Sequence, residues 1–514
     1  MSKVSLKKNF ILNALLTISG IIFPIISFPY VSRILGPTGT GKVDFAASFI
    51  SYFALFASLG IPTYGIRACA QVRDDRIKLS RTVHELITIN AVMSMLSIIV
   101  FVPFLFFLPK VSSEKLLYII TASTLVLNVF GVEYLYKGVE DYSYITIRSL
   151  VFKFISLIAM FVFIHKESDY ISYGAISVFA SSASSLLNFI HSHKYIQHHD
   201  LGKLDYKRHF RPIAVFFAMS CAVSLYVSLD RVMLGFMTND DEVGYYGSAV
   251  KIKSILIALV TSLGNVLMPR ASYCVKQGMM DEFERLICKA MRFVFLVATP
   301  LFLFFSIFAK DGILFISGRE YFSSIPAMQV ITPTVLFIGI TGLIGIQIFV
   351  PLGKEKYVLY SEIAGALTDI ILNLILIPRF KATGAAMGTL AAEFVVLVVQ
   401  LYLLYRIKNE TPVIRVFKKI SYWKTVIASI AATSASIWIC VVYPIFFSSQ
   451  IIVGGKEFGV DMLNSFVRLL IAALIFFGVY TIVMLLTKDE MMLEIISMII
   501  KKLKRKDTSD VHIH

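Results

Sequence analysis

The sequence predicts an all-α integral membrane protein, and three observations support this fold class. The chain of 514 residues is 57% hydrophobic and only 16% charged, whereas soluble domains carry about 25% charged residues. Its mean hydropathy is +0.77. The apolar residues come in runs such as "NFILNALLTISGIIFPIISFPYV" and "ITINAVMSMLSIIVFVPFLFFLP", and about 20 such residues form a helix that crosses the hydrocarbon core of a bilayer.

Apolar runs of this kind recur along the whole chain. Hydropathy predicts about fourteen membrane-spanning helices, and the polar stretches, roughly 15 to 25 residues at their longest, are too short to fold as a soluble domain. The first run is too long for a secretory signal and has no small-residue cleavage pattern, so we assign it as the first span. The spans are expected near 9–34, 42–66, 83–108, 114–137, 142–164, 170–194, 212–236, 243–269, 287–309, 325–350, 355–377, 383–405, 422–447 and 462–487.

Positive charge is concentrated on one side of this topology. The net charge is +16, and most Lys and Arg residues outside the spans lie on the side that holds both termini. Because cytoplasmic loops retain positive charge, both termini are predicted to be cytoplasmic. We attribute the basic blocks, including the tail "KKLKRK", to topology and to attraction of anionic lipid headgroups. The loops are too short for the folded basic surface that binds nucleic acid, so no nucleic-acid partner is expected.

Five prolines interrupt otherwise helical runs. Proline removes a backbone hydrogen bond and kinks a helix, so kinks are expected in several spans, as in a transporter that bends or in a static membrane protein. The residues are Pro24, Pro29, Pro103, Pro300 and Pro333.

Ionisable residues within the spans are the main functional signal. Each one costs several kcal/mol in hydrocarbon unless it is paired or hydrated. We therefore predict a hydrated central cavity of mixed sign with a cationic contribution; the alternative is a set of buried ion pairs that hold helices together. The residues inside the spans are Asp44, Glu133, Lys153, Lys251, Lys253, Glu362, Asp369 and Glu393. Those nearer the ends are Arg33, Arg67, Arg148, Asp230, Arg231 and Arg270.

Neither cysteine nor histidine patterns predict a metal or redox site. The five cysteines are scattered and never spaced C-x-x-C, which is typical of small apolar residues in a core. The histidine-rich stretch "HSHKYIQHHD" (191–200) lacks a matching cysteine or carboxylate set and is interpreted as a solvated connector. We predict no metal, no cofactor and no catalytic residue.

The chain carries an internal repeat with an offset of about 200 residues, of the kind that many transporters show. Three pairs of similar stretches recur in the same order, so spans 1–6 and 7–12 are predicted to form two parallel repeats, with two helices appended. Transporters built in this way bind substrate between the repeats. The pairs are "SRILGPTGTGKVDFAAS" (32–48) with "DRVMLGFMTNDDEVGYYGSA" (230–249), "LGIPTYGIRA" (59–68) with "LGNVLMPRAS" (263–272), and "DYISYGAISVFASS" (169–182) with "FKATGAAMGTLAAE" (380–393).

The repeat defines a domain organisation. We predict two six-helix lobes joined by cytoplasmic linkers to each other and to a final helix pair. The lobes are 1–195 and 212–406, the linkers 196–211 and 407–421, the last two helices 422–487, and the basic tail 488–514.

One stretch imitates a nucleotide-binding loop. From Gly36, "GPTGTGK" matches seven of the eight positions of a P-loop, but Val43 replaces the Ser or Thr that would hold Mg²⁺, and an apolar helix replaces the preceding strand. The repeat partner "GFMTNDDEVG" keeps the bounding glycines and has no lysine. We therefore interpret this stretch as the outer turn between spans 1 and 2.

With these repeats, the sequence resembles the MOP (multidrug/oligosaccharidyl-lipid/polysaccharide) exporter superfamily, in which two six-helix halves form V-shaped lobes. Four stretches, taken in order, resemble its Wzx-type polysaccharide flippases, and the resemblance covers residues 5–410. They are "FPYVSRILGPTGTGKVDFA", "EYLYKGVEDYSYITIRSL", "LDRVMLGFMTNDDEVGYYGSAVKI" and "LNLILIPRFKATGAAMGTLAAE".

The resemblance implies a flippase rather than an enzyme. Its substrate would be an undecaprenyl-pyrophosphate-linked oligosaccharide, moved by alternating access from the cytoplasmic to the outer leaflet of the bacterial inner membrane for capsule or O-antigen assembly. Implied partners are membrane lipids and the polymerase and glycosyltransferases of the same pathway, and a monomer is expected. Basic side chains would replace water around the pyrophosphate. Candidate substrate-binding residues are Lys251, Lys253, Arg33, Arg67, Arg148, Lys153 and Arg270, with Asp44 and Glu133 as sugar contacts or pairing partners.

The resemblance also implies an ion gradient, of Na⁺ or H⁺, as the energy source. Related lipid II flippases bind a cation through oxygen ligands in the second half, and such ligands suit a hard cation. In this chain the carboxylate and the amide of span 11 stand in swapped order relative to that pattern. The candidate ion-binding residues are Asp230, Asp369, Asn373 and Thr389.

Three alternative functions are weighed against polysaccharide flipping. A lipid II flippase would share the fold and the charge pattern. A MATE-like drug/cation antiporter is disfavoured by Lys251 and Lys253, which would repel a cationic cargo. A membrane polysaccharide polymerase would carry a large outward loop with catalytic residues, whereas every predicted outward loop is short.

Overall fold

The computed structural model describes residues 6–197, 201–408, 422–442, 460–494 and 496–497. These residues form helices and turns, and no strand occurs among them, so the predicted all-α fold is confirmed. They divide into two compact units. Unit 1 comprises Met1–Ser248 and Ile370–Ala385, and unit 2 comprises Ala249–Asp369 and Ala386–His514. Because these units are defined by contacts and the predicted lobes by sequence, the lobe boundaries stay a prediction; most of the second linker and of the basic tail lies outside the described residues.

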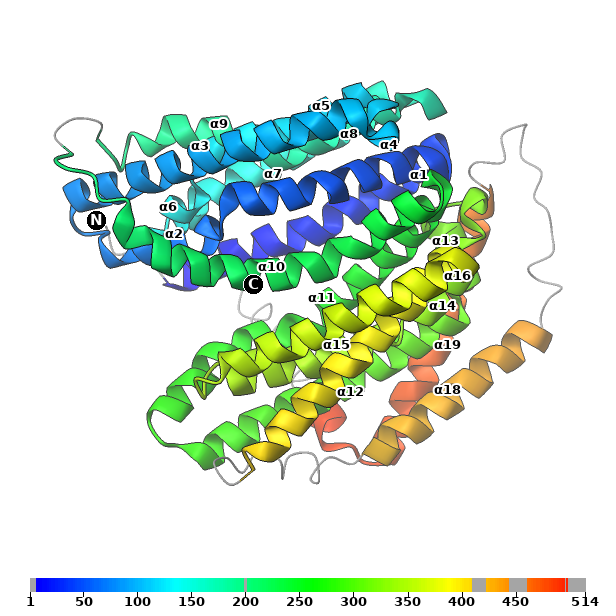
Figure 1. The fold of residues 1–514 in the computed structure, drawn as a ribbon. Coiled ribbons are helices and arrows are strands. Elements are labelled where there is room, and N and C mark those ends of the chain that lie inside the picture. The colour runs from blue at the N-terminus through cyan, green and yellow to red at the C-terminus, as the bar shows by residue number, and fades with distance from the viewer. Residues whose placement is uncertain (1–5, 198–200, 409–421, 443–459, 495, 498–514) are drawn as a thin grey trace, which may run out of the picture. The chain divides into compact units, whose positions relative to one another are not determined.

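Unit 1 is built around α1 (Leu6–Ser58), which packs against α3 (Arg76–Phe107), α7 (Tyr142–Phe163) and α10 (Lys207–Met237). These helices run alongside one another in Figure 1. The other elements are α2 (Ile61–Gln71), α4 (Pro109–Ser112), α5 (Lys115–Leu127), η1 (Asn128–Phe130), α6 (Glu133–Gly138), η2 (Glu167–Asp169), α8 (Tyr170–Val178), η3 (Phe179–Ala183), α9 (Ser184–Ser192) and the start of α11 (Asp240–Lys276).

Unit 2 contains the remainder of α11 and most of α16 (Glu355–Arg406). Its last helices, α18 (Tyr422–Val442) and α19 (Val460–Leu486), pack against each other, and both contact α12 (Met280–Ile307). The remaining elements are α13 (Ala309–Ile316), η4 (Arg319–Tyr321), α14 (Ser324–Ile331), α15 (Thr334–Gly342) and η5 (Leu343–Phe349).

Two very long helices each hold two predicted spans. α1 has 53 residues and is broken at Gly36, whose φ is 63°. α16 has 52 residues and is broken at Lys381, whose φ is 52°. A positive φ lies outside the right-handed helical region, so each break separates two helical segments. Pro24, Pro29, Pro103 and Pro300 lie inside helices, as predicted, and Pro333 lies between α14 and α15.

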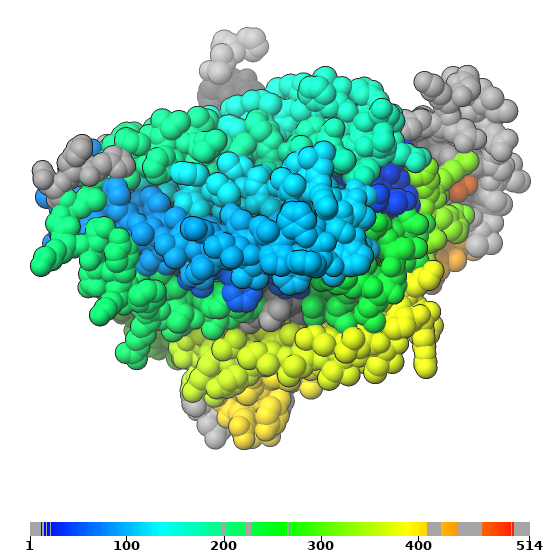
Figure 2. Space-filling view, turned by 45° about the horizontal axis from the view of Figure 1, so that its top comes forward, coloured from blue at the N-terminus to red at the C-terminus, as the bar shows by residue number. Residues whose placement is uncertain are grey.

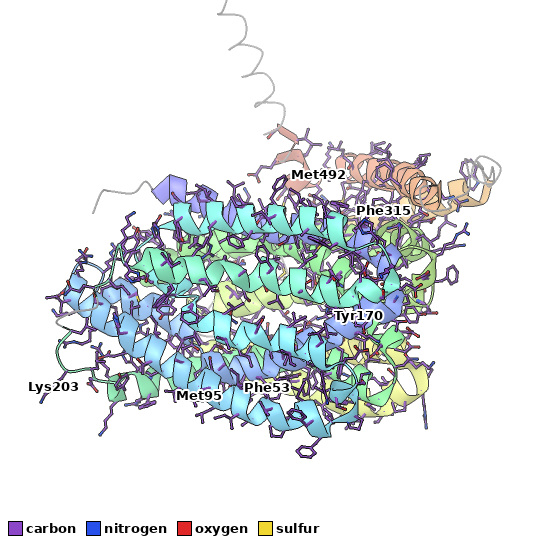
Figure 3. All side chains as sticks on the ribbon, turned by 90° about the horizontal axis from the view of Figure 1, so that it is seen from above. Phe53, Met95, Tyr170, Lys203, Phe315 and Met492 are labelled. Atoms are coloured by element: carbon purple, nitrogen blue, oxygen red, sulfur yellow. The ribbon has the colours of Figure 1, made fainter. Side chains whose placement is uncertain are left out.

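The exterior of the molecule is apolar. Met95, labelled in Figure 3, is 65% exposed on α3, and Phe107 at the end of that helix is 84% exposed. Figure 2 shows one face on which the blue and cyan helices of unit 1 pack into a continuous surface. Such a surface matches hydrocarbon rather than water. In the part of the chain that the structure describes, nine helices are long and apolar enough to cross a membrane. The protein is therefore a multi-pass membrane protein, while the count of about fourteen spans stays a prediction.

The first predicted linker is held against α3 by a buried carboxylate. Glu85 is fully buried, and its Oε2 accepts a hydrogen bond from Arg208 and lies 2.7 Å from Nε2 of His209. Its Oε1 accepts the backbone N–H of Asp205 at 2.6 Å, and the Tyr64 hydroxyl lies 2.8 Å from Nδ1 of His209. This cluster was missed by the sequence analysis, because its partners are more than a hundred residues apart.

Replacing Glu85 by alanine is expected to destabilise the protein by about 3 kcal/mol, because it leaves buried donors without their acceptor. Thermal unfolding of the purified protein in detergent measures the effect. Glu167→Ala, at an exposed position in η2, removes the same charge and should leave the melting temperature unchanged. Equal melting temperatures for the two variants would mean that the cluster does not stabilise the fold.

Candidate functional site: a turn cluster, a carboxylate–amide cluster and an arginine pocket

Three turns meet at one end of unit 1, and we call them the turn cluster: residues 36–42, 238–244 and 379–384. Thr38 donates a hydrogen bond to Asp241, and Glu242 accepts the backbone N–H of Ala382 at 3.1 Å. Glycines allow the first two turns to touch. A Cβ atom on Gly41 would lie 1.8 Å from the carbonyl oxygen of Asp240, and one on Gly244 would lie 2.1 Å from that of Pro37. The two stretches that match each other in the internal repeat thus pack together directly.

Ion pairs surround the turn cluster, and one of them involves Lys42, the lysine of the P-loop-like stretch. Lys42 Nζ lies 2.5 Å from Glu114 Oε1, and its amine lies 4.6 Å from the centre of the Tyr170 ring. The Tyr170 hydroxyl donates to the other oxygen of Glu114 at 2.7 Å. Lys110 pairs with Asp240 at 2.9 Å. Lys42 therefore has a carboxylate partner and follows a helix, which agrees with a turn rather than a phosphate-binding loop.

A buried carboxylate–amide cluster lies in the same unit. Asp230 is 4% exposed; its Oδ1 accepts a hydrogen bond from Asn373 Nδ2 at 2.7 Å, and its Oδ2 accepts one from the Tyr246 hydroxyl. The other two candidates, Asp369 and Thr389, also lie on α16 and are 1% and 4% exposed, but they belong to unit 2. The structure thus joins two of the four candidate ion-binding residues. Tyr246 was missed, since a tyrosine in "GYYGSA" carries no ion-binding signal.

The candidate substrate-binding residues are divided between the units. In unit 1, Arg33 donates to the backbone oxygen of Pro29 at 2.6 Å, and Lys153 on α7 donates to the Ser19 hydroxyl of α1 at 2.9 Å. Asp44 is half-buried on α1 and Arg67 is exposed on α2. In unit 2, Lys251 and Lys253 are half-buried on α11. Arg270 is exposed and pairs with Glu282 at 2.5 Å.

Arg148 and Glu133, both candidates, form a pair beside a pocket in unit 1. The pocket has a volume of about 500 Å³ and lies between α7 and α9. The Arg148 side chain is only 5% exposed, and its Nη2 donates to Glu133 Oε1 at 2.9 Å. Lys137 Nζ lies 3.3 Å from the other oxygen of Glu133. Neither Nε nor Nη1 of Arg148 has a hydrogen-bond partner among the described residues.

Aromatic rings form one wall of this arginine pocket. The Tyr144 ring stacks on His191 with a centroid distance of 3.9 Å and an interplanar angle of 13°. The Arg148 guanidinium lies 5.9 Å from the centre of the Tyr144 ring, and the Tyr144 hydroxyl donates to the backbone oxygen of Leu187 at 3.0 Å. His191 had been interpreted as part of a solvated connector; its ring instead packs in unit 1. Tyr144 and Arg148 are four residues apart and so lie on one helix face. This spacing was the sequence feature that could have indicated their contact.

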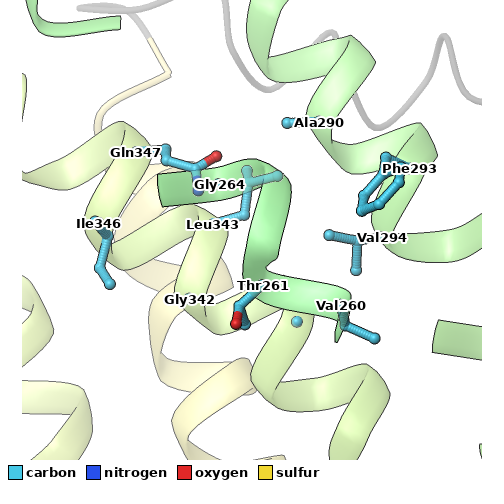
Figure 4. A pocket seen from close by; sticks show the side chains of 11 residues that line it. Val260, Thr261, Gly264, Ala290, Phe293, Val294, Gly342, Leu343, Ile346 and Gln347 are labelled. Atoms are coloured by element: carbon cyan, nitrogen blue, oxygen red, sulfur yellow. The ribbon is translucent and has the colours of Figure 1, made fainter. Parts of the chain in front are cut away.

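A second cavity, of about 40 Å³, lies in unit 2 between α11, α12 and the junction of α15 with η5 (Figure 4). Gly264 and Gly342 line it together with Gln347 and Phe293. A water molecule occupies about 30 Å³ in the liquid. The cavity therefore has room for water and not for a sugar or a pyrophosphate, and we do not assign it to the substrate.

Comparisons with known proteins place this geometry in a family. The family model described as "Polysaccharide biosynthesis protein" matches residues 6–274, more than half of the chain. The "Putative O-antigen transporter" of Escherichia coli (strain K12) is 25% identical over 402 residues, which are 77% of this chain and 95% of that protein. A protein of the same name from Shigella dysenteriae is 20% identical over 409 residues, 77% of this chain and 99% of that one.

Solved structures show the same fold at low identity. Lipid II flippase MurJ in an inward closed conformation aligns with a TM-score of 0.58 and 15% identity, over 89% of this chain and 99% of that one. An inward-facing multidrug resistance MATE family transporter of the MOP superfamily aligns with a TM-score of 0.60 and 14% identity, over 75% of this chain and 95% of that one. These two structures share the fold of this chain. The curated relatives are named as transporters, in agreement with the prediction that the chain is not an enzyme. The chain belongs to the family described as "Polysaccharide biosynthesis protein".

Proposed function

We propose that the protein is a flippase that moves an undecaprenyl-pyrophosphate-linked oligosaccharide from the cytoplasmic to the outer leaflet of a bacterial inner membrane, with both termini in the cytoplasm. Family membership supports a role in polysaccharide biosynthesis, and the names of the curated relatives support O-antigen or capsule units as cargo. The apolar exterior supports a function within the bilayer.

The single observation that carries an alternating-access mechanism is the turn cluster. There, a turn of the first repeat touches its counterpart in the second repeat through Gly41 and Gly244. The two turns lie about 200 residues apart in the sequence, at equivalent places of the two repeats. A contact between equivalent turns closes one end of a pathway between two repeats. Separation of the turns would open that end, and the positive-inside pattern supports its position on the outer side.

The experiment that tests this function is deletion of the gene in its native host. We expect loss of surface polysaccharide and accumulation of lipid-linked repeat units, both reversed by a plasmid copy. A deletion strain that keeps its polysaccharide, or a plasmid copy that instead rescues depletion of a lipid II flippase, would contradict the proposal.

Ion coupling is part of the same proposal. Asp230, Asn373, Asp369 and Thr389 supply oxygen ligands of the kind that bind a hard cation, and the first two are already in contact. Binding of Na⁺ or H⁺ at this cluster would compete with the Asn373–Asp230 hydrogen bond and so bias the position of α16.

Replacing Asp369 by alanine is expected to remove any dependence of flipping on the sodium or proton gradient, because it deletes a buried carboxylate ligand. Flipping assayed in vesicles with and without each gradient measures the effect. Glu355→Ala, at the exposed start of α16, is the matched control. An Asp369→Ala variant with unchanged gradient dependence would exclude this residue from the coupling site.

A further inference from the structure

The arginine pocket between α7 and α9 is lined by both charged and apolar side chains. Asp141, Arg148, His191 and Lys194 supply its polar and charged groups. Ile147 and Leu187 also line it and are 61% and 44% exposed. A site that offers both charged groups and exposed apolar side chains fits an amphiphile better than a free ion.

Arg148 carries unused hydrogen-bonding capacity. Its side chain is 5% exposed, one nitrogen is bound by Glu133, and the atoms Nε and Nη1 are buried without an acceptor among the described residues. A buried donor without a partner is costly, and a buried guanidinium more so. Nη2, the terminal nitrogen on the same side as Nε–H, is already taken by Glu133. Nε and Nη1 can therefore each donate a separate charge-assisted hydrogen bond to an oxygen of a phosphate or carboxylate group.

A second residue of the pocket, His191, also has a buried nitrogen without a hydrogen-bond partner among the described residues. This nitrogen is Nε2, and stacking on Tyr144 fixes the plane of the His191 ring. With the amine of Lys194, which also lines the pocket, the site offers several hydrogen-bond donors to one anionic group. A phosphate-containing head group carries more oxygens than a carboxylate and can accept from all of them.

We propose that the arginine pocket binds the phosphate head of a lipid, with Arg148, His191 and Lys194 as hydrogen-bond donors and the chain of the lipid along Ile147 and Leu187. The pocket includes Lys194, just after the end of α9, on the predicted cytoplasmic side where a substrate would load. Its identification with the head of the transported lipid rests on the proposed function; its affinity for a phosphate-headed lipid does not.

Native mass spectrometry of the purified full-length protein tests this pocket. The probes are undecaprenyl pyrophosphate, phosphatidylglycerol and inorganic pyrophosphate. We expect Arg148→Gln to weaken lipid binding by about 10-fold or more, the loss of one or two charge-assisted hydrogen bonds, and Arg148→Lys to restore it only in part. His191→Phe keeps the stacked ring and removes Nε2, so it should cause a smaller loss. Arg285→Gln, at an exposed position on α12, removes the same charge and should bind as the native protein does.

The outcomes separate the pocket from the transport function. Arg148-dependent binding of undecaprenyl pyrophosphate in preference to phosphatidylglycerol supports the pocket and identifies the transported lipid as its ligand; equal binding supports a general phospholipid headgroup site. Full binding by both Arg148→Gln and His191→Phe, or inorganic pyrophosphate bound as tightly as the lipids, overturns the proposal. Polysaccharide export is measured separately. If the native protein supports export but its lipid binding does not depend on Arg148, only the proposed lipid site is contradicted. If lipid binding depends on Arg148 but the native protein supports no export, only the proposed flippase function is contradicted.

Discussion

Replacing Lys251 and Lys253 together by alanine is expected to abolish surface polysaccharide while the protein still inserts at the native level. Both lysines are half-buried on α11, and a charge at membrane depth is retained only where it is paired or hydrated. If each lysine forms a charge-assisted hydrogen bond of about 1.5–3 kcal/mol with the substrate, the loss of both lowers its affinity at least about 100-fold. Export in the deletion strain, scored by polysaccharide staining, measures the effect.

The control for this double variant comes from the same helix. Lys276, at the exposed end of α11, can be replaced by alanine and should leave export intact. Restoring positive charge with Lys251→Arg and Lys253→Arg should recover part of the export. Normal export in the alanine double variant, at native protein levels, would remove these two lysines from the substrate path.

Replacing Gly244 by alanine is expected to reduce export at least about 10-fold, because the new methyl group prevents closure of the turn cluster. The added Cβ would lie 2.1 Å from the carbonyl oxygen of Pro37 and 2.9 Å from its Cα, and backbone atoms cannot move aside as a flexible side chain can. A shift of about 1.4 kcal/mol against the closed arrangement lowers its equilibrium constant tenfold. Cysteines at Thr38 and Asp241, whose side chains are in contact, report on closure by disulfide formation.

The expected result is rapid crosslinking of the cysteine pair in the native background and slow crosslinking in the Gly244→Ala background. Gly478→Ala on α19 is the matched control, because a Cβ there meets no atom within 4 Å. Equal crosslinking and equal export for the two variants would show that close packing of the turns is not required for transport.

Much of the fold could be predicted because the hydropathy of a span depends only on consecutive residues in the sequence. The apolar runs are a local property of the chain, so the predicted all-α membrane fold agrees with the structure, while the kinks expected at the prolines stay a prediction. The break at Gly36 was expected from the repeat, in which glycines bound both turns. The break at Lys381 falls in the gap predicted between spans 355–377 and 383–405, although no glycine supplies its positive φ.

The residue types of the candidate site could be predicted from the sequence, but the contacts between those residues could not. The sequence analysis names Arg148 and Glu133 as candidate substrate-binding residues and Asp230 and Asn373 as candidate ion-binding residues, and the structure joins them as two pairs. The stacking of Tyr144 on His191 depends on how α7 and α9 pack in three dimensions. The buried cluster around Glu85 was not predicted, because the residues that donate hydrogen bonds to this carboxylate lie more than a hundred positions later in the sequence.

The most direct test of the central claim is reconstitution of the purified protein in lipid vesicles with a fluorescent undecaprenyl-pyrophosphate-linked oligosaccharide on the outer surface. Addition of a membrane-impermeant quencher shows how much of the probe has moved to the inner leaflet. Our account predicts that vesicles with the native protein protect about half of the probe, while empty vesicles and vesicles with the Lys251→Ala, Lys253→Ala variant protect none. Native protein vesicles whose probe stays fully accessible to the quencher would contradict it.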